Sequence, residues 1–237
     1  MAATTPRARA RARTMADIVR IGREHLAQHG AAALSLRAVA RDLGVVSSAV
    51  YRYVSSRDEL LTMLVVDGYT ELADAVDAAL AQAPADPAER LRVLGRAVRA
   101  WALAEPAGYG LLFGTPVPGY HAPAEQTVAP GTRVIGALLT VLENAYGAGL
   151  LDEPAQLPPV SEQLAGDLVR IRAEFGLALP DWALVRGISL WTGLFGAVSF
   201  EVFDMYGADT FTDRAEVFER HLDSLCALVG LSEARKG

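Results

Sequence analysis

The chain has 237 residues, of which 51% are hydrophobic and 21% are charged, and its net charge is -6. This length suits one large or two modest domains, and the composition is ample for a buried core. The single cysteine, Cys226, excludes an internal disulfide and favours a packing role in a reducing compartment. Because we see no secretory leader, and the apolar stretch 187–200 is too short to span a bilayer, we expect a cytoplasmic protein with no membrane partner.

The charge is unevenly distributed along the chain. Residues 1–60 hold ten arginines and five acidic residues, a balance of +5, so residues 61–237 carry -11. A cationic head on an anionic body can still bind a polyanion, and the charge of the body helps to orient the head. The acidic total therefore does not exclude nucleic acid as a partner.

An arginine run opens the chain. Its arginines occupy alternate positions: Arg7, Arg9, Arg11 and Arg13. No large apolar residue lies among them, so we predict that residues 1–13 form a disordered basic arm. Arms of this kind enter the minor groove of DNA beside a recognition helix. A solvated tail, or a true start of translation at Met15, is the alternative.

Three helices are predicted within residues 14–60. Residues 14–30 have the apolar spacing of an amphipathic helix, and Gly30 is a typical C-terminal cap. Gly44 interrupts the next apolar pattern, where a left-handed backbone would end a second helix. Ala40 lies one turn earlier, at the point where two crossing helices come closest. A compact core is expected from Val39, Leu43, Val45 and Val50.

The third of these helices carries the side chains that we expect to face a ligand. Ser47 is its predicted N-cap. The residues that point away from its apolar stripe are small, polar or cationic: Ser48, Ala49, Tyr51 and Arg52. Because such side chains suit the major groove, we interpret the second and third helices as a helix-turn-helix.

Residues 35–61 resemble the DNA-binding motif of the TetR family of bacterial transcriptional regulators. The hallmarks are Ser35, Ala40, Gly44 followed by Val45, the Ser-Ser-Ala-Val-Tyr stretch from Ser47, and the Arg-Asp-Glu-Leu-Leu sequence from Arg57. The motif covers about a quarter of the chain. The resemblance implies a DNA-binding domain over residues 14–60.

The same resemblance implies two sets of DNA contacts. Phosphates would be held by Ser35, Tyr51, Tyr53 and Arg57, and base edges approached by Arg37, Ser47, Ser48, Ala49 and Arg52. Tyr53 stands where the family usually has histidine, and Arg57 where it usually has lysine, but both keep a donor for phosphate. Phosphate contacts set the register of the protein on the duplex, and contacts to base edges set its sequence preference.

Residues 61–237 are predicted to form a larger helical domain, which makes the whole fold all-α. Ser56 is expected to cap one long helix that runs to residue 83, with Asp67, Glu71 and Asp74 on a solvated face. Further helices are expected over residues 87–104, from Glu105-Pro106, over 130–146, over 160–175, from residue 181 and after residue 212. The predicted caps include Asp86, with Glu89 completing a capping box, and Asp181.

This second domain is expected to bind a small apolar effector. Six aromatic residues are the candidate cavity wall: Trp101, Tyr109, Phe113, Tyr120, Trp191 and Phe195. Polar groups such as His121, Asn144 or Thr192 would fix the ligand. Core packing is the alternative for each aromatic taken alone. Gly193 and Gly196 are read as positions where another backbone comes close.

The segment 191–201 also resembles the C-terminal domain named for a Trp-His-Gly motif in one TetR subfamily, although Phe195 replaces the histidine. That resemblance implies an apolar cavity formed between residues 91 and 200 and a homodimer paired through the last two helices. Metal-ligand spacing, a phosphate loop and a nucleophile elbow are not recognisable, so we expect no metal, no cofactor and no enzyme activity.

The sequence therefore predicts a ligand-responsive transcriptional regulator. It would bind a near-palindromic operator in double-stranded DNA as a dimer and leave it when an apolar effector binds. We predict a repressor; activation is the alternative, because the position of the operator decides between them. A helical enzyme and an effector-independent DNA-binding protein are the competing classes.

Overall fold

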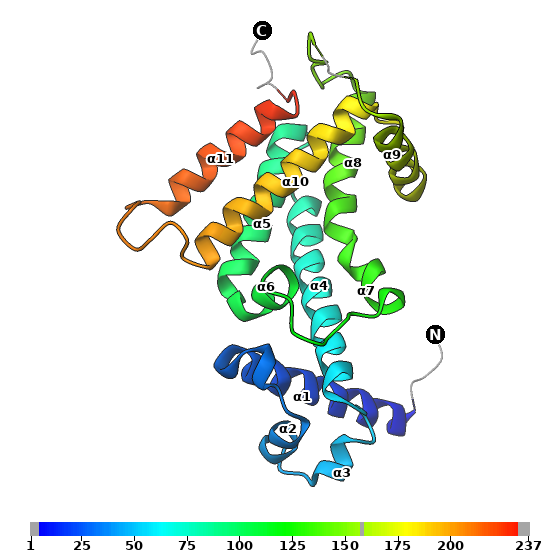
Figure 1. The fold of residues 1–237 in the computed structure, drawn as a ribbon, viewed down its shortest axis with the longest axis vertical. Helices are drawn as coiled ribbons and strands as arrows, with labels where there is room; N and C mark the ends of the chain where they lie inside the picture. The colour runs from blue at the N-terminus through cyan, green and yellow to red at the C-terminus, as the bar shows by residue number, and fades with distance from the viewer. Residues whose placement is uncertain (1–4, 157–158, 232–237) are drawn as a thin grey trace. The chain divides into compact units, whose positions relative to one another are not determined.

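The structure is a computed structural model that describes residues 5–156 and 159–231, and those residues are helical without a strand among them (Figure 1). The predicted all-α fold is confirmed. The chain divides into two compact units: unit 1 comprises residues 1–71 and 104–131, and unit 2 comprises residues 72–103 and 132–237. Unit 1 extends past the expected boundary at residue 60 and includes later segments of the chain, and the expected division into functional domains stays a prediction.

Unit 1 contains the N-terminal helices and part of the long helix α4. Its elements are α1 (Pro6–His29), the short 3-10 helix η1 (Ala31–Ala33), α2 (Leu36–Asp42), α3 (Ser47–Val50), the first part of α4 (Arg57–Ala81), α6 (Pro106–Phe113) and α7 (Ala124–Gly131). Gly68 explains how α6 joins this unit: a Cβ there would lie 3.4 Å from the Leu112 side chain. The glycine leaves room for α6 to approach α4. Sequence analysis did not identify α7, which holds Pro130 inside it.

The core of unit 1 joins α1, α2, α3 and α4. Ile18, Val39, Val54, Leu60 and Leu61 are fully or almost fully buried there. Apolar burial on this scale stabilises the folded state by about 25 cal/mol per Å². The three N-terminal helices are therefore folded around the first turns of α4.

The arginine run at the N-terminus is helical from Pro6, so the prediction of a disordered arm is wrong for residues 6–13. Thr5 caps the helix, since its hydroxyl accepts a hydrogen bond from the Ala8 amide at 3.2 Å. Proline at the first position, followed by alternating arginine and alanine, also favours a helix. Residues 1–4 of the predicted arm lie outside the described residues.

Unit 2 contains the rest of α4 and five further helices: α5 (Pro87–Ala104), α8 (Arg133–Gly147), α9 (Glu162–Phe175), α10 (Asp181–Val202) and α11 (Arg214–Leu228). Figure 1 shows α11 beside α10, with α8 and α9 on the other side of α10. Among the described helices, α10 alone is long and apolar enough to cross a membrane, with a mean hydropathy of 1.4. Its packing against three neighbours is that of a core helix.

Two glycines in unit 2 mark close helix packing. A Cβ at Gly95 would lie 2.5 Å from Leu222, and one at Gly193 would lie 2.7 Å from Leu225, so α11 packs tightly on α5 and α10. This confirms the expected close approach at Gly193. Within the single chain nothing approaches Gly196, which is exposed and has open space around it, so the same expectation stays a prediction there.

The predicted helix caps are only partly confirmed. Asp86 caps α5, since its carboxylate accepts from the Glu89 amide at 2.9 Å. In a capping box the side chain of Glu89 would bind the backbone at the helix start, but here its carboxylate contacts arginines of its own helix. Asp181 is not a cap: Pro180 takes that position, and Asp181 instead accepts from Arg172 of α9 at 2.7 Å.

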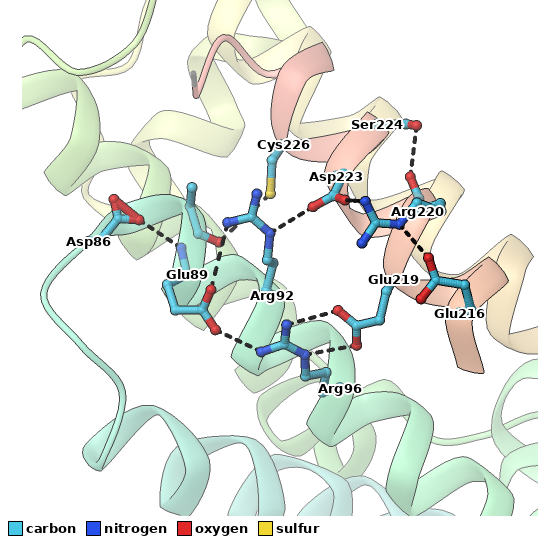
Figure 2. A network of polar contacts seen from close by, with 11 residues as sticks. Asp86, Glu89, Arg92, Arg96, Glu216, Glu219, Arg220, Asp223, Ser224 and Cys226 are labelled. Atoms are coloured by element: carbon cyan, nitrogen blue, oxygen red, sulfur yellow. Dashed lines mark hydrogen bonds and ion pairs between the residues drawn. The ribbon is translucent and has the colours of Figure 1, made fainter. Parts of the chain in front are cut away.

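Arginines of α5 and carboxylates of α11 form an ion-pair ladder (Figure 2). Arg96 donates to both carboxylate oxygens of Glu219, at 2.9 and 2.8 Å. One turn away, Arg92 donates to Asp223 at 3.0 Å. Hydrogen bonds from Arg96 hold the pKa of Glu219 below its usual range. The ladder fixes the position of α11 along α5.

Beside the ladder, the thiol of Cys226 lies 3.7 Å from the carbonyl oxygen of Ala88 on α5. Burial raises the pKa of Cys226 to about 11. The group is therefore a neutral thiol at pH 7, which agrees with the packing role expected from the sequence.

Replacing Glu219 by glutamine tests the ladder. Because the pKa of Glu219 is depressed in the folded protein, its contribution is present above the unfolded pKa and is lost as the pH falls through the folded value. We expect Glu219→Gln to lower the free energy of unfolding by about 1 kcal/mol at pH 7 and by less near pH 4. Urea denaturation at the two pH values measures both.

Glu216→Gln is the matched control on the same helix. Glu216 is 61% exposed and pairs only within α11, with Arg220 at 3.0 Å. Exposed pairs of this kind contribute a few tenths of a kcal/mol. Equal losses of unfolding free energy in the two variants would show that the ion pair between the helices stabilises the fold no more than an exposed pair within one helix.

Candidate nucleic-acid interface

The helix-turn-helix of unit 1 has the turn that the sequence predicts. Gly44 has φ of +70°, a left-handed conformation that glycine adopts without strain, and its amide donates to the Arg41 carbonyl at 3.0 Å. The Val45 amide donates to the Ala40 carbonyl at 3.0 Å, which completes the end of α2. Ala40 is 1% exposed, so the small residue at the crossing is also confirmed.

Two local predictions for the recognition helix α3 are wrong. Val46, and not Ser47, is the N-cap, and no side chain caps this helix. Ser47 lies inside the first turn, where its carbonyl accepts from the Tyr51 amide at 3.1 Å. Val45 is 44% exposed and does not join the core, because its backbone forms the turn and its side chain points outward. Val46 is 71% exposed, so an apolar side chain lies on the surface beside α3, a feature that the sequence analysis missed.

Four of the nine side chains expected to reach DNA are exposed, and the other five are half-buried. Arg37, Ser48, Tyr51 and Arg52 are exposed, and Tyr51 shows 47% of its surface. The remaining small residues are half-buried: Ser35, Ser47 and Ala49. The helix-turn-helix therefore exposes two guanidinium groups and two hydroxyl groups, which are available to a polar ligand.

Tyr53 has a neighbour that sequence analysis missed. The guanidinium carbon of Arg11 lies over the Tyr53 ring, 5.2 Å from its centre, so the first turns of α1 reach the end of the helix-turn-helix. Continuity of the helical pattern back through the arginine run is the signal that could have revealed this contact.

Arg57 is held inside unit 1 by the backbone carbonyls of η1. One terminal nitrogen donates to the Ala31 carbonyl at 2.8 Å, and the other lies 3.7 Å from Asp58. The side chain is half-buried, with 34% of its surface exposed. Arg57 therefore joins the start of α4 to η1, a structural role that the sequence did not indicate.

The start of α4 is fixed by a reciprocal cap. Ser56 accepts from the Glu59 amide at 3.0 Å, which confirms the predicted N-cap. Glu59 in return accepts from both the amide and the hydroxyl of Ser55, each at 2.6 Å. These hydrogen bonds lower the pKa of Glu59. Three hydrogen bonds therefore hold the link between α3 and α4.

A cluster around Arg23 joins three helices of unit 1. This arginine of α1 contacts Asp67 at 3.2 Å and Glu71 at 2.6 Å on α4, and Glu105 at 2.9 Å at the start of α6. Three carboxylates thus share one guanidinium group. We call Arg23, Asp67, Glu71 and Glu105 the Arg23 cluster.

The Arg23 cluster corrects the expectation that Asp67, Glu71 and Asp74 form a merely solvated face. Asp74 instead pairs with Arg133 of α8 at 2.8 Å, within unit 2. Burial raises the pKa of Asp67 in spite of the adjacent Arg23, and the nearby Glu71 raises it further. The hydrogen bond to Glu71 raises the pKa of Arg23, so the guanidinium stays charged.

The structure separates the candidate effector residues into two groups. Tyr109, Phe113 and Tyr120 belong to unit 1, where Tyr109 is fully buried with its ring 5.1 Å from that of Phe113. Trp101, Trp191 and Phe195 belong to unit 2, where the last two rings lie 4.2 Å apart. A common cavity for the six stays a prediction.

The polar groups proposed beside these rings are all exposed: His121, Asn144 and Thr192. Thr192 donates to the Ile188 carbonyl of its own helix at 3.1 Å, as an ordinary helical threonine does. Across the residues that the structure describes, no group of three His, Cys, Asp or Glu side chains is arranged to hold a metal ion.

Comparison with known proteins agrees with this geometry. Residues 14–64 match the family described as bacterial regulatory proteins, tetR family, and residues 91–225 match the tetracyclin repressor-like C-terminal domain. HTH-type transcriptional regulators of Mycobacterium bovis and Mycobacterium tuberculosis are 47% identical over 224 residues, covering 93% of this chain and 94% of theirs. The resemblance to a Trp-His-Gly subfamily stays a prediction.

Solved structures show the same fold. The regulatory protein SCO4313 is 35% identical, with a TM-score of 0.75 over 94% of this chain and 100% of its own. The TetR family regulator PfmR from Thermus thermophilus, at 18% identity, has a TM-score of 0.58 over 91% of this chain and 99% of its own. Because two family matches cover most of the chain, and long relatives share nearly half of its residues, this protein belongs to the TetR family of bacterial transcriptional regulators.

Proposed function

We propose that this regulator is a repressor that binds a near-palindromic operator as a homodimer, with one helix-turn-helix in each half-site. The observation that carries the proposal is the exposed set Arg37, Ser48, Tyr51 and Arg52 on a motif whose turn is closed by backbone hydrogen bonds and whose helices share a buried core. A rigid element that presents donors in this way can match the base edges of a major groove. A protein with this function acts on DNA in the cytoplasm.

The exposed residues divide into two roles. Arg37 and Arg52 can donate two hydrogen bonds to a guanine edge, whereas the hydroxyl groups of Tyr51 and Tyr53 suit phosphate oxygens. Ser47, Ser48 and Ala49 are small enough to let α3 enter the groove. Ser35, at the start of α2, would donate to a phosphate, and Arg57 would do so with the donors that η1 leaves free.

The dimer would form through α10 and α11. Apolar side chains are exposed on α10, after it and on α11: Ile188, Phe200, Phe203, Met205 and Leu228, with exposed fractions between 43% and 58%. Single exposed apolar residues are ordinary, but several of them on two adjacent long helices and on the segment between these helices favour an interface. A two-fold dimer then reads a two-fold operator.

Arg37→Ala tests base recognition. We expect the variant to lose about 1–3 kcal/mol of discrimination at one position of each half-site, because a bidentate base contact is removed. The measurement is the affinity for a duplex selected by this protein from a random pool and for single-base variants of it. Thermal melting should be unchanged, because Arg37 is exposed.

Tyr51→Phe is the matched control, since it removes one phosphate donor and keeps the ring. It should weaken binding to all the duplexes by the same factor. If Arg37→Ala also weakens all of them alike, Arg37 does not read a base.

The response to an effector is proposed to pass through the Arg23 cluster. This cluster joins α1 of the DNA-binding helices to α4 and to the start of α6, so a displacement of α6 or α4 would separate Arg23 from its partners. A small apolar effector among the aromatic residues would favour that displaced arrangement. It can shift the equilibrium only by its difference in affinity for the two arrangements.

Arg23→Gln and Asp67→Asn should have opposite effects on stability. Loss of the guanidinium group leaves the carboxylates to repel one another, so we expect Arg23→Gln to lower the free energy of unfolding by about 2 kcal/mol at pH 7. The pKa of Asp67 is raised in the folded protein. Above that pKa the carboxylate is charged, and this charge costs more free energy in the folded than in the unfolded chain. Asp67→Asn should therefore equal or exceed the wild type at pH 7.

Urea denaturation at several pH values checks both variants. The advantage of Asp67→Asn should disappear as the pH falls, because the wild-type carboxyl then takes up its own proton. Operator affinity of Arg23→Gln, measured on the same selected duplex, reports whether the cluster also orients α1. Unchanged stability and unchanged affinity would remove the cluster from the proposed response.

A further inference from the structure

We propose that the first two turns of α1 form a second DNA-contacting surface, a helical arginine arm whose Arg7 and Arg11 bind phosphates that flank the helix-turn-helix. The proposal rests on the proposed function, because it needs the protein to be seated on its operator. It replaces the expectation of a disordered arm in the minor groove. The partner is the sugar-phosphate backbone of duplex DNA.

Helix geometry divides the four arginines into two rows. An α-helix turns by about 100° per residue, so residues four apart share a side and residues two apart lie nearly opposite. Arg7 and Arg11 form one row, and Arg9 and Arg13 form the other; all four are exposed. A single duplex can be contacted by one row at a time.

The contact between Arg11 and Tyr53 identifies the row that faces DNA. Arg11 lies over the Tyr53 ring, 5.2 Å from its centre, at the end of the helix-turn-helix. Arg7 is one turn further out on the same side. The Arg7 and Arg11 row thus lies on the side of α1 that faces Tyr53, whereas helix geometry turns Arg9 and Arg13 away from Tyr53.

The charge at this helix end points to an anionic partner. The N-terminus of a helix already carries a partial positive charge, and the four arginines add to it. No acidic residue lies in the first turn, and the first acid along the chain is Asp17. The arrangement is electrostatically unfavourable in the free protein, and phosphate groups would relieve it.

The helical form decides how the arm can bind. A helix with its side chains is about 10–12 Å across, whereas the minor groove of B-DNA is about 6 Å wide. The arm therefore lies over the backbone and cannot enter the groove as a whole. Its contribution is expected to be independent of sequence and strongly dependent on salt.

Two double variants with the same change in charge test the proposal: Arg7→Ala/Arg11→Ala and Arg9→Ala/Arg13→Ala. Alanine keeps the helix. Affinity is measured over about 50–200 mM salt on a duplex selected by the wild type and on an unselected duplex of equal length. For Arg7→Ala/Arg11→Ala we expect the slope of log affinity against log salt, which is negative, to become shallower by about 2 per bound headpiece on both duplexes.

For Arg9→Ala/Arg13→Ala we expect less than half of that change. Equal losses in the two variants would mean that only net charge matters, and would overturn the assigned row. An unchanged affinity and salt dependence in both variants would overturn the proposed contact between the arm and DNA. If the arm variants behave as the wild type while Arg37→Ala still loses discrimination, the arm fails and the proposed function stands. If the wild type selects no duplex, the proposed function itself fails.

A third variant, Ala10→Gly/Ala12→Gly, tests the helical form with every arginine kept. Glycine disfavours a helix relative to alanine, so the arm should lose order and the slope should change in the same direction as for Arg7→Ala/Arg11→Ala. Circular dichroism measures the lost helix. Loss of helix with unchanged binding would overturn the claim that the arm acts as a helix.

Discussion

The packing of α4 into the N-terminal helices is the constraint on which the rest of the structure depends. Leu60 and Leu61 are fully buried among α1, α2 and α3, and the Leu64 side chain lies 3.3 Å from the position that a Cβ on Gly22 would take. The DNA-binding helices are therefore not a separate domain attached to α4. They are folded around its first turns, so any reorientation of that part of α4 moves the recognition helix with it.

Arginine has different roles at different depths of the molecule. The partly buried Arg23 and Arg92 each contact carboxylates of other helices, and these bonds define how the helices pack. The exposed Arg37 and Arg52 lie on the helix-turn-helix, where a guanidinium group can meet an outside partner. Because a buried charge is tolerated only when it is paired, burial separates structural arginines from those available to DNA.

The sequence predicted what depends on local patterns. Gly44 and Ala40 were identifiable because a left-handed turn and a close helix crossing restrict the residue type. The arginine run was misjudged because its low hydrophobicity indicates disorder, although alternating alanine and arginine favour a helix once α1 supplies a folded continuation. The partners of Arg23 lie 44 residues or more away along the chain, and no local pattern indicates them.

Arg57 shows how a departure from the family pattern can be accommodated. The family usually has lysine at this position, whose three donors are all on one nitrogen. Arginine has five donors in a fixed planar arrangement. One terminal nitrogen of Arg57 already binds the Ala31 carbonyl at 2.8 Å, and the half-exposed remainder of the group keeps further donors. The substitution therefore lets one side chain stabilise the start of α4 and still meet the DNA backbone that our proposed function places beside it.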